Sequence, residues 1–122
     1  MSIQDPGQHH QAFQDAFNRG DIEALLALYA PDAIVVSEPG HEVSGKAGIR
    51  AFLEELLSME RTATIETRSV VVVGDIALTR GKWALRGTGA DGQPLEMGGD
   101  NAEVSRRQPD GTWLSIIDNP WA

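Results

Sequence analysis

The sequence predicts a single α+β domain, residues 1–122, in which a curved antiparallel sheet wraps around three N-terminal helices. Apolar residues recur at helical spacing up to about residue 60, whereas β-branched residues and alternation from Thr62 onward are typical of strands. A chain of 122 residues has room for one hydrophobic core. Helices followed by a strand meander define the α+β class, and long twisted strands beside amphipathic helices favour a sheet that encloses a cavity.

The first two helices are predicted from their apolar spacing and their end signals. The first runs from about Gln8 to Arg19 and ends at Gly20, a favourable C-terminal stop. Asp21 caps the second, which carries Tyr29 at the end of its buried face. Pro31-Asp32 ends this helix, because proline is poorly tolerated inside one.

A short buried strand, Ala33–Ser37, and the turn Glu38-Pro39-Gly40 lead to the third helix. This helix is predicted from about Lys46 to Glu60 and has the clearest helical signal in the chain. Its apolar residues at positions i, i+3, i+4, i+7 and i+8 are Ile49, Phe52, Leu53, Leu56 and Leu57.

The second half of the chain is predicted to form four strands joined by tight turns. The strands span Thr62–Val73, Ile76–Thr88, Leu95–Arg107 and Trp113–Asp118. Gly-Asp, Asp-Gly and Pro-Asp-Gly signatures separate them. Together these strands form the predicted antiparallel meander.

The charge and composition exclude several function classes. The net charge is −8, which argues against a nucleic-acid or anionic-membrane partner. The chain has no cysteine, so disulfide, thiolate and iron–sulfur chemistry are excluded. No apolar run approaches the roughly 20 residues that a bilayer span needs, and no secretory pattern opens the sequence. We therefore expect a small cytoplasmic domain without a membrane or nucleic-acid partner.

The order of the elements and three local motifs resemble the nuclear transport factor 2-like superfamily. The motifs are AFNRGDIEALLALYAPDAIVV (Ala16 to Val36), SGKAGIRAFLEELL (Ser44 to Leu57) and RRQPDGTWLSIIDNPW (Arg106 to Trp121). Within the superfamily the chain looks most like SnoaL-like and ketosteroid-isomerase-like proteins. The resemblance implies a cone-shaped, cystatin-like fold, a pocket between sheet and helices, and a homodimer formed through the sheet.

The catalytic roles of ketosteroid isomerases carry over only in part. The oxyanion-hole tyrosine of that family corresponds to Phe13, which cannot donate a hydrogen bond. Its general-base aspartate corresponds to Ser37, which is not a carboxylate. Its protonated carboxylic acid corresponds to Glu103. With two of three roles missing, ketosteroid isomerisation is not the expected reaction.

Glu103 and Asp118 are the candidate catalytic residues. Asn101 and Glu103 share one face of their strand, and pairing of Arg107 with Thr112 would place Asp118 opposite Asn101. Two carboxyls on one cavity wall would push one pKa upward. A one-residue slip at the Pro-Asp-Gly turn would instead direct Asp118 outward, and Glu103 would be an ordinary surface charge if its face met solvent.

The candidate ligand-binding residues add apolar walls to this polar group. They are Phe17, Tyr29, Ser37, Trp83, Asn101 and Trp121, with Ile34 and Val36 as further wall residues. Trp83 lies on an otherwise apolar strand face, and Trp121 could close the mouth of the cone. Tryptophans are also frequent core or interface residues, so this assignment competes with a structural one.

The three histidines are interpreted as surface residues. His9 and His10 are adjacent on a helix, so they point about 100° apart and should not face one site. His41 lies in a turn, and no spacing typical of metal ligands occurs. We therefore expect no metal and no cofactor.

Three functions remain open at this point. The first is a small-molecule-binding domain with an isomerase- or cyclase-like activity, in which Glu103 or Asp118 transfers a proton. The second is a binding module that uses the same pocket without chemistry. The third is a dimerisation or assembly module whose cone is filled.

Overall fold

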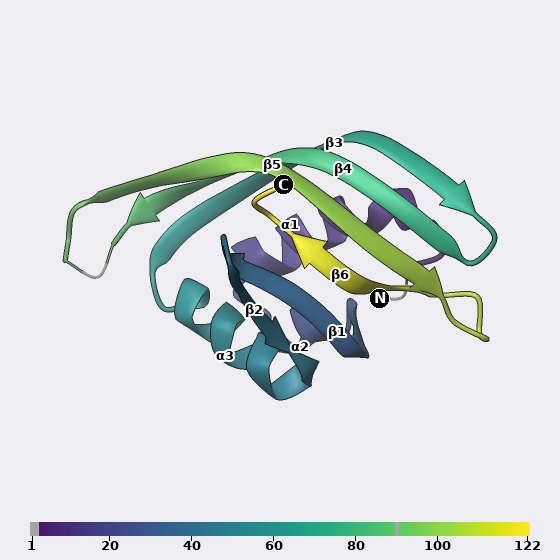
Figure 1. Cartoon of the computed structure of the whole chain (residues 1–122). Coiled ribbons are helices and arrows are strands. Elements are labelled where there is room, and N and C mark those ends of the chain that lie inside the picture. Colours follow the sequence, from purple (N-terminus) through teal and green to yellow (C-terminus); the bar gives the residue numbers. More distant parts are fainter. Residues whose placement is uncertain (1–2, 90) are drawn as a thin grey trace.

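The computed structural model describes residues 3–89 and 91–122 and shows three helices below a long, arched sheet (Figure 1). The helical elements are η1 (Pro6–Gln8), α1 (His9–Asn18), α2 (Ile22–Leu26) and α3 (Gly45–Leu57). The strands are β1 (Tyr29–Glu38), β2 (His41–Ser44), β3 (Glu60–Val73), β4 (Ile76–Thr88), β5 (Pro94–Arg107) and β6 (Trp113–Asn119). Within the described residues, no helix combines the length and apolar character that a membrane span needs.

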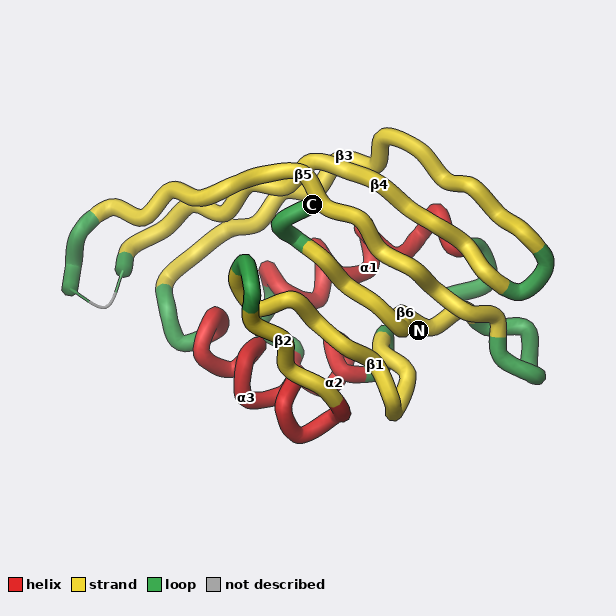
Figure 2. Tube along the Cα trace, in the orientation of Figure 1, coloured by secondary structure: helices red, strands yellow, loops and turns green. Residues whose placement is uncertain are grey.

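The six strands form one curved sheet in the order β2-β1-β6-β5-β4-β3. Strands β3 to β6 form the predicted antiparallel meander. The sheet as a whole is mixed, because β1 pairs in parallel with β6. Strands β3, β4 and β5 have 13 or 14 residues each and arch over α1 (Figure 2). The predicted α+β class and curved sheet are confirmed.

Three predicted boundaries are wrong. Tyr29 does not end a helix but opens β1, because it pairs with Ser115 of β6. Pro31-Asp32 lies inside β1, where the register shifts between Tyr29 and Ile34, and proline is tolerated at such an irregularity. The third helix ends at Leu57, three residues early, because β3 begins at Glu60.

Strand β2 was not expected from the sequence. It is only four residues long and pairs antiparallel with β1 across the predicted turn at Pro39-Gly40. Gly40 there has a φ of 84°, which a glycine adopts readily. Its exposed side chains lack a strand's alternation, and backbone pairing with β1 alone determines its conformation.

The inner and outer faces of the sheet differ in what covers them. On the inner side α1 contributes Ala16 and Phe17 to the core, and α3 contributes Ile49 and Leu53, each at most 2% exposed. The outer face carries exposed apolar residues: Val71, Val73, Ile76, Leu78 and Ile117 are each at least 40% exposed. An apolar outer face is unusual for a monomeric domain.

Candidate functional site

A cavity of about 140 Å³ lies between the inner face of the sheet and helices α1 and α3. Six of the seven aromatic side chains of the chain line it: Phe13, Phe17, Tyr29, Phe52, Trp83 and Trp121. Val35, Leu53, Leu56 and Met97 add aliphatic surface. Several of the lining side chains are only half-buried, so the cavity is accessible from solvent. Its volume excludes a completely filled cone.

The aromatic residues are held in place by one another and by the backbone. The rings of Trp83 and Trp121 meet edge to face, with centroids 5.4 Å apart. Their indole N–H groups donate to the carbonyls of Pro120 and Ser37, at 2.6 and 3.2 Å. Trp121 thereby holds the C-terminal segment against β1, and both tryptophans line the cavity.

A smaller polar annex of about 60 Å³ adjoins the aromatic cavity. The two spaces share five lining residues: Phe13, Ile65, Trp83, Asp118 and Pro120. The annex adds Asn101 and Glu103, which are 6% and 7% exposed. The structure thus brings the predicted polar residues together at one side of the predicted aromatic pocket.

Asp118 reaches the inner face through two register shifts. Arg107 pairs with Trp113, one residue later than predicted, and this shift alone would direct Asp118 outward. A second irregularity between Val104 and Ser105 leaves Ile116 as an extra residue in β6 and restores the side chain to the inner face. Asp118 therefore lies opposite Glu103, not opposite Asn101 as predicted.

The two opposed carboxyls have different environments. The hydroxyl of Tyr29 donates to Asp118 Oδ2 at 2.7 Å, which favours the ionised form of Asp118. Glu103 Oε1 is buried and has no hydrogen-bond donor within the described residues. Burial raises the pKa of Glu103 well above its usual value, the charge of Asp118 raises it further, and the nearby Ser115 hydroxyl opposes the rise.

Of the two carboxyls, Glu103 therefore retains its proton to higher pH, and Asp118 is the one that ionises first. Burial also raises the pKa of Asp118, but the Tyr29 hydrogen bond lowers it. Burial and the adjacent Asp118 charge raise the pKa of Tyr29 well above 10, so its hydroxyl stays protonated and continues to donate. Two like charges at this distance would repel each other, and retention of one proton on Glu103 avoids that cost.

His9 and His10 are buried, which contradicts the prediction of surface residues; they are 2% and 4% exposed. His9 Nε2 lies 3.0 Å from the carbonyl oxygen of Trp113, to which it donates, and His9 Nδ1 lies 3.7 Å from Glu103 Oε1. Burial lowers the pKa of His9, so the ring is neutral and its free lone pair is directed at the Glu103 carboxyl. This orientation again suits a protonated Glu103.

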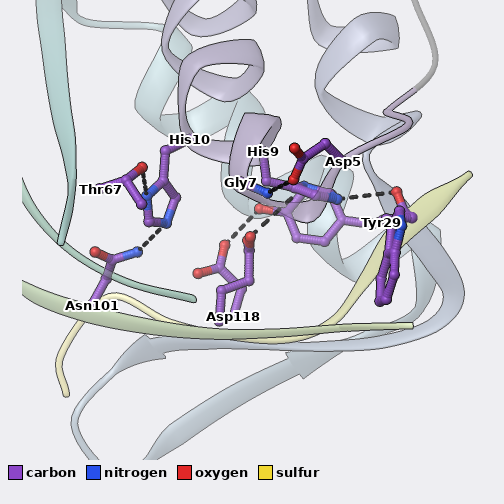
Figure 3. A network of polar contacts seen from close by, with 10 residues as sticks. Asp5, Gly7, His9, His10, Tyr29, Thr67, Asn101 and Asp118 are labelled. Atoms are coloured by element: carbon purple, nitrogen blue, oxygen red, sulfur yellow. Dashed lines mark hydrogen bonds and ion pairs between the residues drawn. The ribbon is translucent and has the colours of Figure 1, made fainter. Parts of the chain in front are cut away.

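His10 lies over a row of residues that crosses three strands (Figure 3). Thr67 of β3, Gly81 of β4 and Asn101 of β5 are neighbours in that row. The ring of His10 bonds the two outer residues, with Nδ1 2.8 Å from Thr67 Oγ1 and Nε2 2.9 Å from Asn101 Nδ2. Gly81, between them, leaves room for the ring.

The adjacency of His9 and His10 on one helix predicts that they face different sites, and the fold overrides this prediction. The curved sheet lies along both sides of the start of α1, so side chains about 100° apart still reach the same strand: His10 contacts Asn101 of β5, and His9 lies near Glu103 of β5. A usable signal was the small residue Gly81 at an inward position of an otherwise regular strand.

The remaining predicted wall residues fall into two groups. Phe17 and Ser37 line the cavity, as proposed from the sequence. Ile34 and Val36 do not, because Val35 and Ser37 occupy the inner face of β1 and alternate residues point to the other side. Among the described residues, no group of three or more potential ligands could hold a metal ion.

Comparisons with known proteins identify the fold and the family. A comparison with curated proteins gave no match. A ketosteroid isomerase-like protein from Erwinia carotovora atroseptica is 23% identical, with a TM-score of 0.79 and coverage of 91% of this chain and 88% of the other. A nuclear transport factor 2-like superfamily protein from Salmonella enterica serovar Typhimurium is 17% identical, with a TM-score of 0.81 and coverage of 95% and 88%.

A nuclear transport factor 2-like protein with a cystatin-like fold from Novosphingobium aromaticivorans is 20% identical, with a TM-score of 0.77 and coverage of 92% of this chain and 75% of the other. At these identities the likeness concerns the fold, which hosts many unrelated functions. The sequence itself matches the SnoaL-like domain over residues 10–116. The chain therefore belongs to the SnoaL-like domain family and has the nuclear transport factor 2-like fold.

Proposed function

We propose that this protein binds a small apolar molecule in the aromatic cavity and positions it against Asp118. The observation that carries the proposal is the pairing of Asp118 with Glu103 at the junction of the aromatic cavity and the polar annex. An apolar cavity with a few convergent polar groups and perturbed carboxyls is the usual form of a ligand site.

In the enzymatic form of this proposal, Asp118 is the base and Glu103 the acid of an isomerase- or cyclase-like reaction. Asp118 accepts a proton from the bound molecule, and Glu103 holds a second proton in the same annex, whose wall Asn101 and His10 complete. The pair thus offers one acceptor and one donor in neutral solution, the combination that proton transfer between two positions of a substrate requires.

Carboxyl titration tests the acid–base pair directly. We expect the 13C carboxyl resonances of Asp118 and Glu103 to titrate at higher pH than those of exposed carboxyls, with Glu103 the higher of the two because it lacks a donor. Asp118→Asn should lower the pKa of Glu103, since it removes the neighbouring Asp118 charge that helps to raise it. Ordinary titration of both groups would end the acid–base proposal.

A binding role without chemistry is the second candidate, and two residues favour it. Phe13 stacks on Phe17 at 5.8 Å and offers the cavity no hydrogen-bond donor. The Ser37 hydroxyl bonds the carbonyl of His41 at 3.4 Å. Denaturing extraction of the purified protein, followed by mass spectrometry, separates the two candidates. A molecule recovered unchanged after prolonged incubation indicates binding, and conversion to a product indicates catalysis.

A homodimer formed through the sheet is part of the proposal. Cross-strand neighbours Val71, Leu78, Val104 and Ile117 form an apolar row over β3 to β6 on the outer face. Val71, Leu78 and Ile117 are 56%, 40% and 45% exposed, and a second copy would bury them.

The outer row predicts a concentration-dependent dimer. Leu78→Lys should shift sedimentation-equilibrium data toward the monomer, because burial of an unpaired ammonium at the interface is costly. The control is Arg80→Lys, an exposed position on the same face of β4 that keeps its charge. A wild-type protein that stays monomeric at about 100 μM would contradict the dimer but not the ligand pocket.

A further inference from the structure

Within the described part of the chain, the side chains that line the aromatic cavity offer a ligand no free hydrogen-bond donor. Four of its lining residues carry N–H or O–H groups, and all four donate within the protein: Tyr29 to Asp118, Ser37 to His41, Trp83 to Pro120 and Trp121 to Ser37. A ligand that needs to accept a hydrogen bond, such as a carboxylate or a phosphate ester, would have to break one of these contacts.

Unused acceptors, in contrast, are present. Asp118 Oδ2 receives the Tyr29 hydroxyl, whereas no described residue donates to Asp118 Oδ1. A further acceptor atom of the annex, Asn101 Oδ1, is buried and also lacks a donor within the described residues. A buried acceptor without a donor destabilises the fold, so a ligand that brings N–H groups to this wall gains what the protein lacks.

Among the residues that the structure describes, no cationic side chain lines either space. The residues around the cavity and the annex include no lysine or arginine. Arg61 stacks on the Phe17 ring at 5.0 Å, but its guanidinium donates to the Phe17 carbonyl and it is not a lining residue. His10 is held neutral, because burial and the neighbouring His9 lower its pKa to about 4. Negative charge on Asp118 is therefore not balanced from within the pocket.

The aromatic walls of the cavity favour a positively charged ligand, and the cavity volume limits the size of that ligand. Aromatic ring faces attract cations, most strongly when the cation is removed from water. The cavity volume of about 140 Å³ is close to the roughly 150 Å³ of an engineered apolar cavity that takes up benzene. One aromatic ring with a short polar arm fits this space, and a multi-ring molecule does not.

We infer that the pocket selects a compact aromatic amine, bound as its ammonium ion with the ring in the aromatic cavity and the N–H groups on Asp118. This inference rests on the proposed binding function and adds the chemical class of the ligand. It follows from three observations on the described residues that line the aromatic cavity: each side-chain N–H or O–H group donates within the protein, Asp118 keeps a free acceptor, and no lysine or arginine is present.

Three probes of nearly equal size test the inference: benzylamine, benzyl alcohol and sodium benzoate. At pH 7.5 the first is a cation, the second neutral and the third an anion. Binding is measured by isothermal titration calorimetry at constant ionic strength, with the fluorescence of the pocket tryptophans as a second readout. We expect benzylamine to bind about tenfold more tightly than benzyl alcohol, because a charge-assisted hydrogen bond replaces a neutral one. Benzoate should bind most weakly.

Asp118→Asn isolates the carboxylate, since the amide has nearly the same shape and can still accept the Tyr29 hydroxyl. We expect the variant to lose the preference for benzylamine over benzyl alcohol, while its affinity for benzyl alcohol stays within about threefold of wild type. Glu55→Gln, an exposed position on α3, is the matched control for the loss of one negative charge and should keep the wild-type ranking.

The outcomes separate the ligand class from the binding function. If benzyl alcohol or benzoate binds as tightly as benzylamine, the amine inference is wrong while the pocket remains a ligand site. If none of the three binds to the wild-type protein, the proposed binding function fails with it. The wild-type ranking needs no variant, so the inference stays testable even if Asp118→Asn does not fold.

Discussion

Gly81→Ala is expected to lower the free energy of unfolding by about 3 kcal/mol, the upper range for an overpacked core. A Cβ atom at this position would lie 2.6 Å from the Glu66 carbonyl oxygen, 2.8 Å from His10 Cε1 and 2.9 Å from Asn101 Oδ1. The first neighbour is backbone of the adjacent strand and cannot move without breaking the ladder. The other two are the histidine and the amide that bond each other over the glycine.

Urea denaturation followed by circular dichroism measures this effect, and Gly48→Ala is its control. Gly48 lies within α3, and a Cβ atom there would meet only Val43 Cβ at 3.7 Å, an ordinary contact. Alanine is the better helix former, so this variant should gain about 0.5–1 kcal/mol. The same chemical change therefore has opposite signs at the two sites. A neutral or stabilising Gly81→Ala would show that His10 does not lie over this strand.

Acid is expected to destabilise the protein through His10. Burial and His9 lower the pKa of His10 from 6.5 to about 4 in the folded state. The unfolded chain therefore binds a proton between pH 6.5 and 4 that the folded chain does not, and stability is lost as the pH falls through this window. At 1.36 kcal/mol per pKa unit, the loss from His10 is about 3 kcal/mol. His9, whose pKa is also lowered by burial, acts in the same direction.

Glu103 and Asp118 change the pH dependence of stability in the direction opposite to His10. Their contribution must therefore be separated from that of the histidine. The raised pKa values of Glu103 and Asp118 mean that the folded chain keeps protons that the unfolded chain releases, so their contribution falls as the pH rises. The measurement is therefore a difference: unfolding free energies of wild type and His10→Gln at pH 7.5 and pH 4. The unfolding free energy of wild type, taken relative to that of His10→Gln, should be about 3 kcal/mol smaller at pH 4 than at pH 7.5.

His41→Gln is the matched control for the removal of a histidine, because the His41 side chain is 70% exposed in the β1–β2 hairpin. If the difference between wild type and His10→Gln is the same at both pH values, His10 is not held neutral by burial. The buried contacts with Thr67 and Asn101 would then need another explanation.

Local sequence patterns were sufficient to predict the elements whose conformation depends on their own residues. The spacing of Leu53 and its apolar neighbours predicted α3, and the Pro-Asp-Gly turn predicted the β5–β6 hairpin. Alternation in β4 predicted which of its residues face inward. These features depend on periodicity and turn chemistry over a few residues, which a single sequence contains.

Long-range pairing overrode local pattern at several positions. Tyr29 completes a helical stripe in the sequence, but its backbone pairs with Ser115 and it begins a strand instead. Asp118 faces the pocket because two register changes compensate. The shift at the β5–β6 turn would direct its side chain outward, and the bulge in β6 directs it inward again. Neither effect is visible in the residues next to them, because strand register depends on both partners.

The residues of this chain alone predicted one acidic α+β domain with a curved sheet, an aromatic pocket and two candidate catalytic carboxyls. Which groups meet at that pocket depended on the folded sheet. The arch of β3 to β5 around α1 buries two adjacent histidines against the strands, and the bulge in β6 sets Asp118 opposite Glu103. Burial and pairing, which exist only once distant segments meet, then give the two carboxyls different proton affinities.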